Sequence, residues 1–533
     1  MRSLMQDDYQ LTLHHVLDRM RGIAGEKQVV TLGEDGVRRA TYAEVGERID
    51  RLCRGLESLG IAPGDRVATF MWNSQEHLEA YVGVPCMGAV LHTLNIRLFA
   101  EQLTYIANHA EDQVVFVDDS LVPVLEKVAP TFETVRHYVV VGDGDSGSLP
   151  NVVRYEELLA AQPDGYDYPE LDERTAAGLC YTSGTTGNPK GVLYSHRSNV
   201  LHSMGTCMAD GVGVTYSDRL MPVVPMFHAN AWGLPYACGL VGADLIMPSR
   251  FLQAEPIAKL IESERVTIAG AVPTIWMDLL RYADEHKPDF SSLRTVMCGG
   301  AAVPESLMRA FEERHGVRII QAWGMTETSP VGAVARPPAY AEDEEHWDCR
   351  AATGRIMPLV EVRIVGDEGE QPWDGEATGE VEIRGPWIAS DYYNDPTAAE
   401  KFHDGWLRTG DVASVDSKGF MRISDRAKDL IKSGGEWISS VELENELMSH
   451  PSVLEAAVIA KPDERWTERP LACVVLCEGP GCTEEELRAH LASRVAKWWI
   501  PDEFVFIDQV PKTSVGKFDK KVLRRRLADG ELT

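Results

Sequence analysis

The sequence predicts an α/β protein in which a large N-terminal domain of layered α/β subdomains is followed by a small C-terminal α/β domain. Short apolar runs of β-like composition alternate with amphipathic helical stretches along most of the 533 residues, a pattern typical of helices packed on sheets. The length allows about three or four domains with large cores. No internal repeat of fixed period is visible.

The N-terminal elements follow from local signals. Residues 28–32 are typical of a strand, and Thr41 opens a helix because Glu44, three residues later, completes a capping box. The apolar positions of this helix recur at steps of three and four. We expect the next strand at residues 67–71 and a further helix at residues 76–87.

A charged connector marks the expected domain boundary. Charged residues crowd residues 424–432, and a smaller α/β pattern follows, with helices opened by the capping residues Ser439 and Thr483. The expected units are therefore an N-terminal domain of residues 1–425, a hinge region of residues 426–432 and a C-terminal domain of residues 433–533.

The composition is ordinary for a globular protein, but the charge balance is strongly acidic. Residues of hydrophobic type make up 44%, and 52 Lys and Arg against 82 Asp and Glu give a formal net charge of −30. Such a surface repels nucleic acid and anionic lipid, so we expect no nucleic-acid partner. We interpret the acidic segment 342–370 and the basic run 520–527 as solvated faces.

The cysteine pattern and the hydropathy pattern indicate the cellular compartment of the protein. The ten cysteines are scattered without a C-x-x-C pair, which argues against a zinc site and a disulfide framework. The N-terminus lacks the apolar core of a signal peptide, and no apolar run approaches the roughly 20 residues of a membrane helix. We expect a cytoplasmic protein without an integral membrane segment.

The most informative stretch is YTSGTTGNPKG, residues 181–191. Glycine lets backbone N–H groups approach a ligand, and the Ser and Thr hydroxyls with Lys190 add donors that suit a polyphosphate. The loop is not a Walker A motif, because Pro189 precedes Lys190 and Gly191 follows it. A loop of this composition is by itself more often a surface turn, so the phosphate interpretation depends on the motifs downstream.

Three motifs follow in the middle of the chain. PMFHANAWG, residues 225–233, places one histidine and one tryptophan after an apolar run, and VMCGGAAV, residues 296–303, ends a strand in two glycines. QAWGMTETSP, residues 321–330, offers Glu327 as the hard oxygen ligand that Mg²⁺ takes beside substrate phosphates. Its Thr326 can donate to a phosphate, although an isolated Thr-Glu pair would be an unremarkable turn.

Three more motifs lie near the C-terminus. GWLRTGD, residues 405–411, places Asp411 after a Thr-Gly turn, where a carboxylate suits a ribose diol. SDRAKDLIKSGGEWIS, residues 424–439, contains a glycine pair that leaves room for a thin ligand arm. PKTSVGKFDK, residues 511–520, carries Lys517, which alone would be an ordinary solubilising lysine.

In this order the motifs resemble those of the adenylate-forming superfamily, which includes acyl-CoA synthetases, nonribosomal peptide adenylation domains and beetle luciferases. The resemblance extends over nearly the whole chain. It implies that the small C-terminal domain is mobile, that Mg²⁺ is the cofactor, and that ATP, coenzyme A and a small carboxylic acid are the substrates. A homodimer is a candidate assembly.

The resemblance also implies roles for individual residues of this sequence. The catalytic residues are Lys517, His228 and Glu327, with Glu327 and Thr182 as Mg²⁺ contacts and Lys428 as the hinge. The expected ATP and AMP contacts are Thr182, Ser183, Gly184, Thr185, Thr186, Gly187, Lys190, Gly300, Ala301, Gln321, Ala322, Trp323, Gly324, Thr326, Asp411, Arg426 and Lys432. The expected acyl pocket comprises Trp232, Gly300, Met325 and Val331, and the expected pantetheine tunnel comprises Gly434, Gly435 and Trp437.

The chemistry implied is a reaction in two steps. A carboxylate is a poor acyl donor, so reaction with ATP first makes an acyl-adenylate, and a thiolate then expels AMP. The first step joins two anions, so catalysis is chiefly positioning and charge neutralisation. By resemblance, the small domain rotates about Lys428 between the steps and withdraws Lys517.

The acid itself is less well defined. The run DLIKSGGEWISSVELEN is similar to that of fatty acyl-CoA synthetases, which favours a medium- or long-chain fatty acid. Trp323 stands where many long-chain enzymes carry Tyr, so chain length stays open. The alternatives are a ligase for a short-chain or sulfur-containing acid of the methylmercaptopropionate type, an adenylation enzyme loading a carrier protein, a luciferase-like monooxygenase and a nucleotide-binding sensor.

Overall fold

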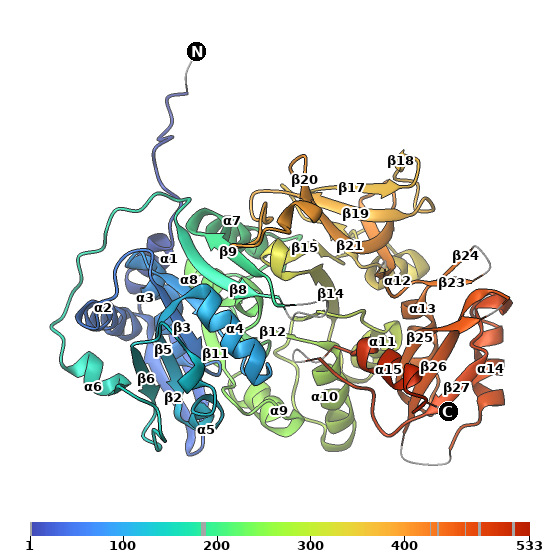
Figure 1. The fold of residues 1–533 in the computed structure, drawn as a ribbon, viewed down its shortest axis with the longest axis horizontal. Coiled ribbons are helices and arrows are strands. Elements are labelled where there is room, and N and C mark those ends of the chain that lie inside the picture. The colour runs from blue at the N-terminus through green and yellow to red at the C-terminus, as the bar shows by residue number, and fades with distance from the viewer. Residues whose placement is uncertain are drawn as a thin grey trace.

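The computed structural model describes residues 3–182, 188–426, 428–433, 436–463, 465–477, 481–513 and 517–532. Within these residues the strands form three sheets with helices packed on them (Figure 1). This architecture confirms the α/β class predicted from the alternation of strand-like and helix-like segments.

One sheet has the strand order β7-β6-β5-β3-β4-β8-β9, and its strands pair in parallel except for the antiparallel pair β8–β9. Its strands are β3 (Arg66–Phe70), β4 (Val90–Thr93), β5 (Asp112–Asp118), β6 (His137–Val141), β7 (Val152–Arg154), β8 (Ala176–Tyr181) and β9 (Gly191–Ser195). The helices that precede, connect or follow its strands are α1 (His14–Arg21), α2 (Tyr42–Ser58), α3 (Gln75–Cys86), α4 (Ala100–Ala110), α5 (Val122–Leu125), α6 (Tyr155–Ala160) and α7 (His196–Cys207).

The largest sheet has a parallel half and an antiparallel half. Strands β1, β11, β10, β12, β13 and β14 pair in parallel, and from β14–β15 onward the pairing is antiparallel. Its strands are β1 (Gln28–Gly33), β2 (Gly36–Thr41), β10 (Arg219–Pro222), β11 (Asp244–Met247), β12 (Ile268–Ala271), β13 (Thr295–Gly299), β14 (Ile319–Gly324), β15 (Val331–Val334), β16 (Gly354–Ile356), β17 (Glu361–Gly366), β18 (Gly369–Glu370), β19 (Gly379–Arg384), β20 (Phe402–His403), β21 (Trp406–Val415) and β22 (Phe420–Arg426). The associated helices are α8 (Leu234–Val241), α9 (Ala254–Ser263), α10 (Pro273–His286), α11 (Glu305–His315) and α12 (Asp343–Ala351).

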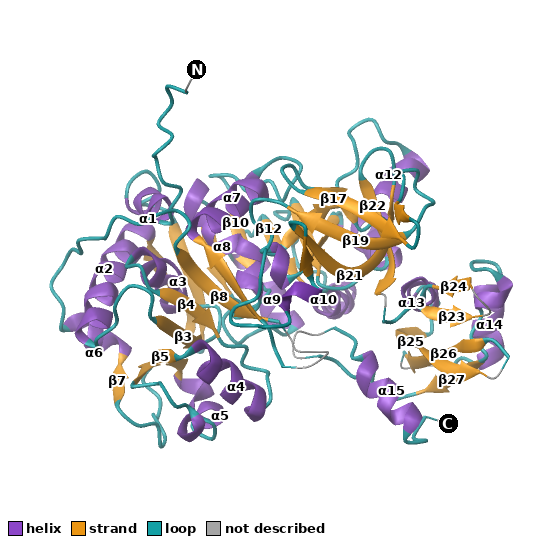
Figure 2. Cartoon of the chain, turned by 45° about the horizontal axis from the view of Figure 1, so that its top comes forward, coloured by secondary structure: helices purple, strands orange, loops and turns teal. Residues whose placement is uncertain are grey.

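A small separate sheet begins after Arg426 and has the order β24-β23-β26-β25, with β27 beside β26. Figure 2 shows it set apart from the body of the molecule. Its elements are β23 (Ile431–Ser433), β24 (Glu436–Ile438), α13 (Ser440–Met448), β25 (Val453–Asp463), β26 (Thr467–Leu476), α14 (Glu484–Ala492), β27 (Glu503–Phe506) and α15 (Lys520–Ala528). Two apolar clusters of its own lie on the faces of this sheet.

The local signals in the sequence correspond to these elements. Helix α2 begins with the predicted capping box, in which the Thr41 side chain accepts from the Glu44 backbone and the Glu44 side chain accepts from the Thr41 backbone. The side chains of Ser439 and Thr483 cap α13 and α14, each accepting from the backbone of the third helical residue, and Thr483 also has the reciprocal bond of a capping box. These caps supply hydrogen bonds to backbone donors that a helix start leaves unpaired.

Two charged runs differ from the expectation of simple solvated faces. In α12, Arg350 is buried, pairs with Glu312 and donates to the Ile319 carbonyl at 2.8 Å. In α15, Lys520 is almost wholly buried and pairs with Glu444. Both corrections have the same reason: a long side chain crosses to a carboxylate on an element that is distant in sequence.

No helix among the described residues is long and apolar enough to span a bilayer.

The carboxyl ends of three strands meet at one place. β8 ends at Tyr181, β13 at Gly299 and β14 at Gly324, where the large sheet changes from parallel to antiparallel pairing. In α/β sheets, ligands bind outside the carboxyl ends of the strands. The fold therefore indicates a ligand-binding site in this region.

Candidate active site

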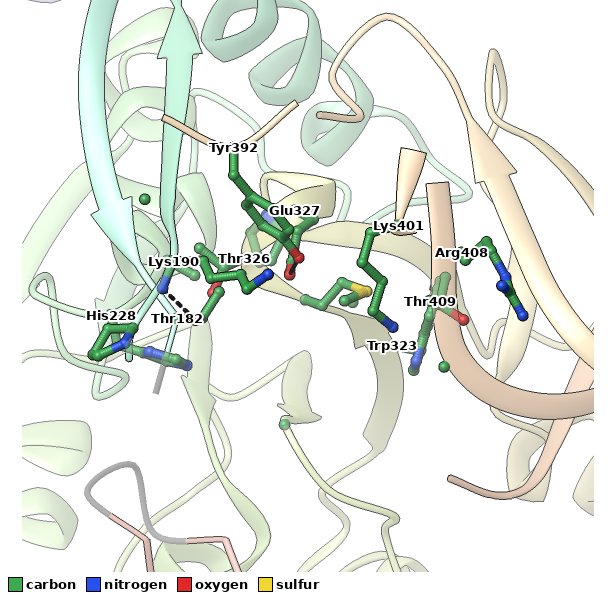
Figure 3. A pocket seen from close by; sticks show the side chains of 18 of the residues that line it. Thr182, Lys190, His228, Trp323, Thr326, Glu327, Tyr392, Lys401, Arg408 and Thr409 are labelled. Carbon is green, nitrogen blue, oxygen red and sulfur yellow. Dashed lines mark hydrogen bonds between the residues drawn. The ribbon is translucent and has the colours of Figure 1, made fainter. Parts of the chain in front are cut away.

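A cavity of about 930 Å³ opens at these strand ends. Its lining includes the β8–β9 hairpin, the strand ends of β13 and β14, the turn at residues 228–232, the loop after β19, and Lys517 from the C-terminal region. Figure 3 shows His228, Thr182 and Lys190 on one side of it and Lys401 and Thr409 on the other. Motifs that lie between Thr182 and Lys517 in the sequence therefore share one space, at about the size expected of a small-molecule site.

The two ends of the glycine-rich loop are held together. Thr182 N donates to the Lys190 carbonyl at 2.9 Å, and Lys190 N donates to Thr182 Oγ1 at 3.0 Å. The Lys190 ammonium pairs with Asp395 at 3.0 Å, donates to Thr397 at 3.0 Å and lies 4.9 Å from the centre of the Tyr392 ring. The predicted phosphate contacts Ser183, Gly184, Thr185, Thr186 and Gly187 lie outside the described residues.

Glu327 is buried and points into the cavity beside Tyr392 (Figure 3). The Tyr392 hydroxyl donates to Glu327 Oε1 at 2.6 Å. Burial, followed by the charge of Glu327, raises the pKa of Tyr392, so the phenol keeps its proton and remains the donor. Neighbouring Thr326 is also buried, and its carbonyl accepts from Tyr194 at 2.7 Å.

Asp411 connects the predicted nucleotide residues of three strands. Its Oδ2 accepts from Trp323 Nε1 at 2.9 Å, and its Oδ1 lies 3.4 Å from Arg426 Nε. Trp323 packs over Gly332, where a Cβ would come within 2.5 Å of the indole. The indole face and the carboxylate are thereby fixed relative to each other, which is what an adenine ring and its ribose would require.

Lys517 enters the site from a distant part of the sequence. Its Cε lies 3.6 Å from the position that a Cβ on Gly300 would take, and Gly300 itself has φ +86°. Burial and then Arg426 lower the pKa of Lys517 to about 8, in spite of the opposing effects of Asp411 and Glu327. A nearby anion raises the pKa of a lysine in such surroundings and favours its charged form.

His228 and Trp232 flank an unusual turn. Ala229, Asn230, Ala231 and Trp232 all have positive φ, between 42° and 60°, a conformation that costs non-glycine residues energy. The turn presses the Trp232 indole toward Gly299 and Gly270, 3.6 Å from the Cβ position of each. Burial, then Lys517 and Arg97, lower the pKa of His228 to about 3, so its imidazole is neutral at physiological pH.

The other predicted residues do not all line the main cavity. Met325, Val331, Ala322 and Gly324 line the cavity, whereas Ala301 and Gln321 line an adjoining space of about 300 Å³ that Lys428 also borders. Lys432 lies in β23 opposite Trp437, with its ammonium 5.2 Å from the indole centre, and neither residue is among the described lining of the two spaces. Gly434 and Gly435 lie outside the described residues.

The loop after β19 contains site residues that no sequence motif predicted. Tyr392, Asp395 and Thr397 come from DYYNDPT, residues 391–397, and they hold Glu327 and Lys190 in place. Burial alone would raise the pKa of Asp395, but hydrogen bonds from Thr397 and Lys190 keep this pKa below its usual range. The available signal was a tyrosine pair directly before an Asn-Asp-Pro turn.

The site fits a metal ion that arrives with its substrate. Glu327 uses one carboxylate oxygen for Tyr392 and has a second to offer, while the described residues contain no group of three His, Cys, Asp or Glu side chains that could hold a metal. Mg²⁺ is commonly bound by one or two carboxylates together with substrate phosphates and water. The donor set fits that mode.

These features define a protein class, and comparison with known families agrees. Residues 22–393 match the AMP-binding enzyme family, and residues 442–517 match the AMP-binding enzyme C-terminal domain. The chain belongs to the AMP-binding enzymes.

Individual relatives cover almost the whole chain. It is 46% identical over 532 residues to the long-chain-fatty-acid–CoA ligase of Thermus thermophilus, covering 98% of this chain and 97% of the relative. It is 44% identical to the medium-chain-fatty-acid–CoA ligase of Ectopseudomonas oleovorans, covering 98% and 96%. It is also 44% identical to the 3-methylmercaptopropionyl-CoA ligase of Ruegeria pomeroyi, covering 97% and 98%.

A solved structure shows the same fold. The anthranilate CoA ligase AuaEII in complex with anthranoyl-AMP superposes with a TM-score of 0.89 at 27% identity, covering 99% of this chain and all of that one.

Proposed function

We propose that the protein activates a medium- or long-chain fatty acid with ATP and transfers the acyl group to coenzyme A, releasing AMP and pyrophosphate. The enzyme class is acid–thiol ligase, of the AMP-forming acyl-CoA synthetase type, as in the three CoA ligases named above. The observation that carries the proposal is the meeting of Glu327, Lys190 and Lys517 around one cavity with an apolar end. Asp411 borders the adjoining space, which Lys517 also lines.

The proposed roles follow from position and charge. Trp323 and Asp411 hold adenine and ribose, and Lys190 with the hydroxyl-rich loop neutralises the leaving pyrophosphate. Lys517 donates to the oxygens at the α-phosphate as the carboxylate attacks, which stabilises charge that develops in the transition state. His228, neutral and close to Lys517, orients the acid carboxylate.

Mg²⁺ belongs to this proposal. Glu327 and Thr182 would hold it against the substrate phosphates, where it would supply charge neutralisation. Tyr392 orients Glu327 through the 2.6 Å hydrogen bond.

The test is ATP–pyrophosphate exchange over a panel of carboxylic acids, followed by product analysis with and without coenzyme A. We expect exchange with fatty acids and acyl-CoA formation only when coenzyme A is present. Absence of exchange with every acid would contradict the proposal.

A sulfur-containing short acid is the second candidate, because the Ruegeria pomeroyi relative has the same identity as the medium-chain relative. Including 3-methylmercaptopropionate in the panel separates the two. Transfer to a carrier protein in place of coenzyme A would appear as exchange without acyl-CoA formation.

A further inference from the structure

The apolar end of the cavity meets the loop of residues 208–218, which connects α7 to β10. Val212 of this loop is buried and lines the cavity with Leu234, Met297 and Val331. All four belong to one continuous apolar cluster. This end is therefore bounded by core side chains instead of solvent.

The cavity can be followed inward from Lys517. That lysine lies against Gly300, the adjacent Gly299 faces Trp232, and Gly270 faces both Trp232 and Leu234, whose Cδ1 is 3.1 Å from the Gly270 Cβ position. The reacting groups and the apolar end are thus joined along the carboxyl ends of β12 and β13. A chain attached to a carboxylate near Lys517 would extend toward Leu234 and Val212.

Arginines from three neighbouring segments fix the backbone on both sides of Val212. Arg336 donates to the carbonyls of Gly211 at 2.6 Å and Val212 at 2.8 Å, and Arg294 donates to that of Gly213 at 2.6 Å. Arg355 lies 3.6 Å from Asp210 in the same loop. Hydrogen bonds from a charged donor are stronger than neutral ones, so the loop cannot yield easily.

Two glycines make the loop tighter still. A Cβ on Gly211 would come within 2.4 Å of the Gly205 carbonyl, and Gly213 has φ +74°. The Gly213 amide also donates to the Thr206 carbonyl at 3.0 Å. The backbone next to Val212 is therefore fixed against the end of α7, and the Val212 side chain is what this loop contributes to the wall.

We propose that Val212 is the floor of the acyl pocket and sets the longest acid that the enzyme accepts. The inference rests on the proposed function and adds the chemistry of the tail: apolar and uncharged at its far end. The carbonyls beside Val212 already accept from arginines, so a terminal carboxylate or ammonium group would be buried without a partner, which is costly. A thioether tail meets no such barrier.

The experiment measures kcat/KM for adenylate formation with straight-chain acids of increasing length. Val212→Phe should lower kcat/KM for the longest acid accepted by about 10-fold or more and leave the shortest acids unchanged, because pocket fit discriminates by this amount per methylene. Val212→Ala should extend the accepted length by about one methylene. A dicarboxylic acid of the preferred length should be rejected by wild type.

The matched control is Val214→Ala. Val214 is in the same loop and, like Val212, is 2% exposed, but it is not among the residues that line the cavity. This variant should keep the wild-type length profile, and a shift equal to that of Val212→Ala would overturn the proposal.

Other outcomes separate the two hypotheses. If Val212→Ala, or a folded Val212→Phe, shows the wild-type dependence of kcat/KM on acid length, Val212 is not the floor of the pocket, although the proposed function stands. Equal use of the dicarboxylic acid by wild type would have the same consequence. Absence of exchange with every acid in wild type would overturn both. Arg336→Met should make the fall in kcat/KM beyond the longest accepted acid less steep, because it removes two of the hydrogen bonds that fix the loop.

Discussion

At the scale of single residues, the site depends on side chains whose ionisation is set by their surroundings. Lys517 is the clearest case, because burial and Arg426 lower its pKa to about 8. Burial also lowers the pKa of His228, to about 3, so the imidazole stays neutral. Of the two side chains, Lys517 is therefore the one that carries a positive charge. The position of each in the sequence does not reveal this division.

We predict an alkaline limit on adenylate formation. Lysine is a cation below its pKa, so the active form of free enzyme predominates below pH 8 and is lost as the pH rises above it. kcat/KM for ATP–pyrophosphate exchange should therefore fall above about pH 8, since this parameter reports ionisations of the free enzyme. Lys517→Arg should move the fall to higher pH.

Lys517→Ala gives the matching loss of function. Adenylate formation should drop by about 10²-fold or more, as when one transition-state donor is removed. Thioester formation from pre-made acyl-adenylate should be largely spared. Equal losses in both half-reactions would contradict a role confined to the first step.

At the scale of elements, the C-terminal helix α15 is tied to the rest of the chain by a buried polar network. Lys520 pairs with Glu444 of α13 at 2.7 Å and donates to Ser440 at 2.5 Å, and the Ser440 backbone donates to Asp425 of β22 at 2.8 Å. Burial alone would lower the pKa of Lys520, but Glu444 and Asp425 together raise it. Because Lys520 follows Lys517 by three residues, this network holds the segment that carries the proposed catalytic lysine.

We predict that Lys520→Met destabilises the protein and slows adenylate formation. Breaking a buried ion pair on one side typically costs about 3–5 kcal/mol, because it leaves the other charge unpaired. Thermal unfolding and the exchange assay measure the two effects. The control is Lys521→Met, the neighbouring exposed lysine, which should change neither.

A double variant, Lys520→Met with Glu444→Met, distinguishes stability from positioning. Replacing both partners by apolar groups should recover most of the stability, while adenylate formation should remain slow because the connection to Ser440 and Asp425 is still missing. Full recovery of the rate would show that Lys520 acts on stability alone.

At the scale of the whole molecule, the chain changes from the large sheet to the small one between Arg426 and Ile431. The backbone turns there, with the amides of Asp429 and Leu430 both donating to the Arg426 carbonyl, at 2.8 Å and 3.0 Å. Lys428, predicted to be the hinge, lies within this turn. The domain boundary and the rotation about it remain predictions.

Lys428→Pro tests that rotation. Proline fixes φ near −65°, so we expect adenylate formation to stay within about 10-fold of wild type while the thioester step loses about 10²-fold, by analogy with the loss of one essential interaction. Lys428→Ala, which keeps the backbone free, should preserve both steps. Normal thioester formation in the proline variant would contradict a hinge at this position.

Much of the site could be predicted from the sequence because its motifs are local. The capping boxes at Thr41 and Thr483 and the hydroxyl-rich stretch before Lys190 each depend on residues a few positions apart. The loop carrying Tyr392 and Asp395 was missed because its role lies in contacts with Glu327 and Lys190, 65 and more residues away. The burial of Lys520 was missed for the same reason.

The sequence by itself determined the α/β class, the order of the motifs and the chemistry they can perform, because these depend on residue type and short spacing. Only the tertiary structure decided which side chains share the cavity, which lysine has a lowered pKa and what closes the apolar end. Burial and electrostatic environment arise from segments far apart in the chain. The Arg336 side chain, for example, donates to the Val212 carbonyl at 2.8 Å, a contact that no local sequence pattern indicates.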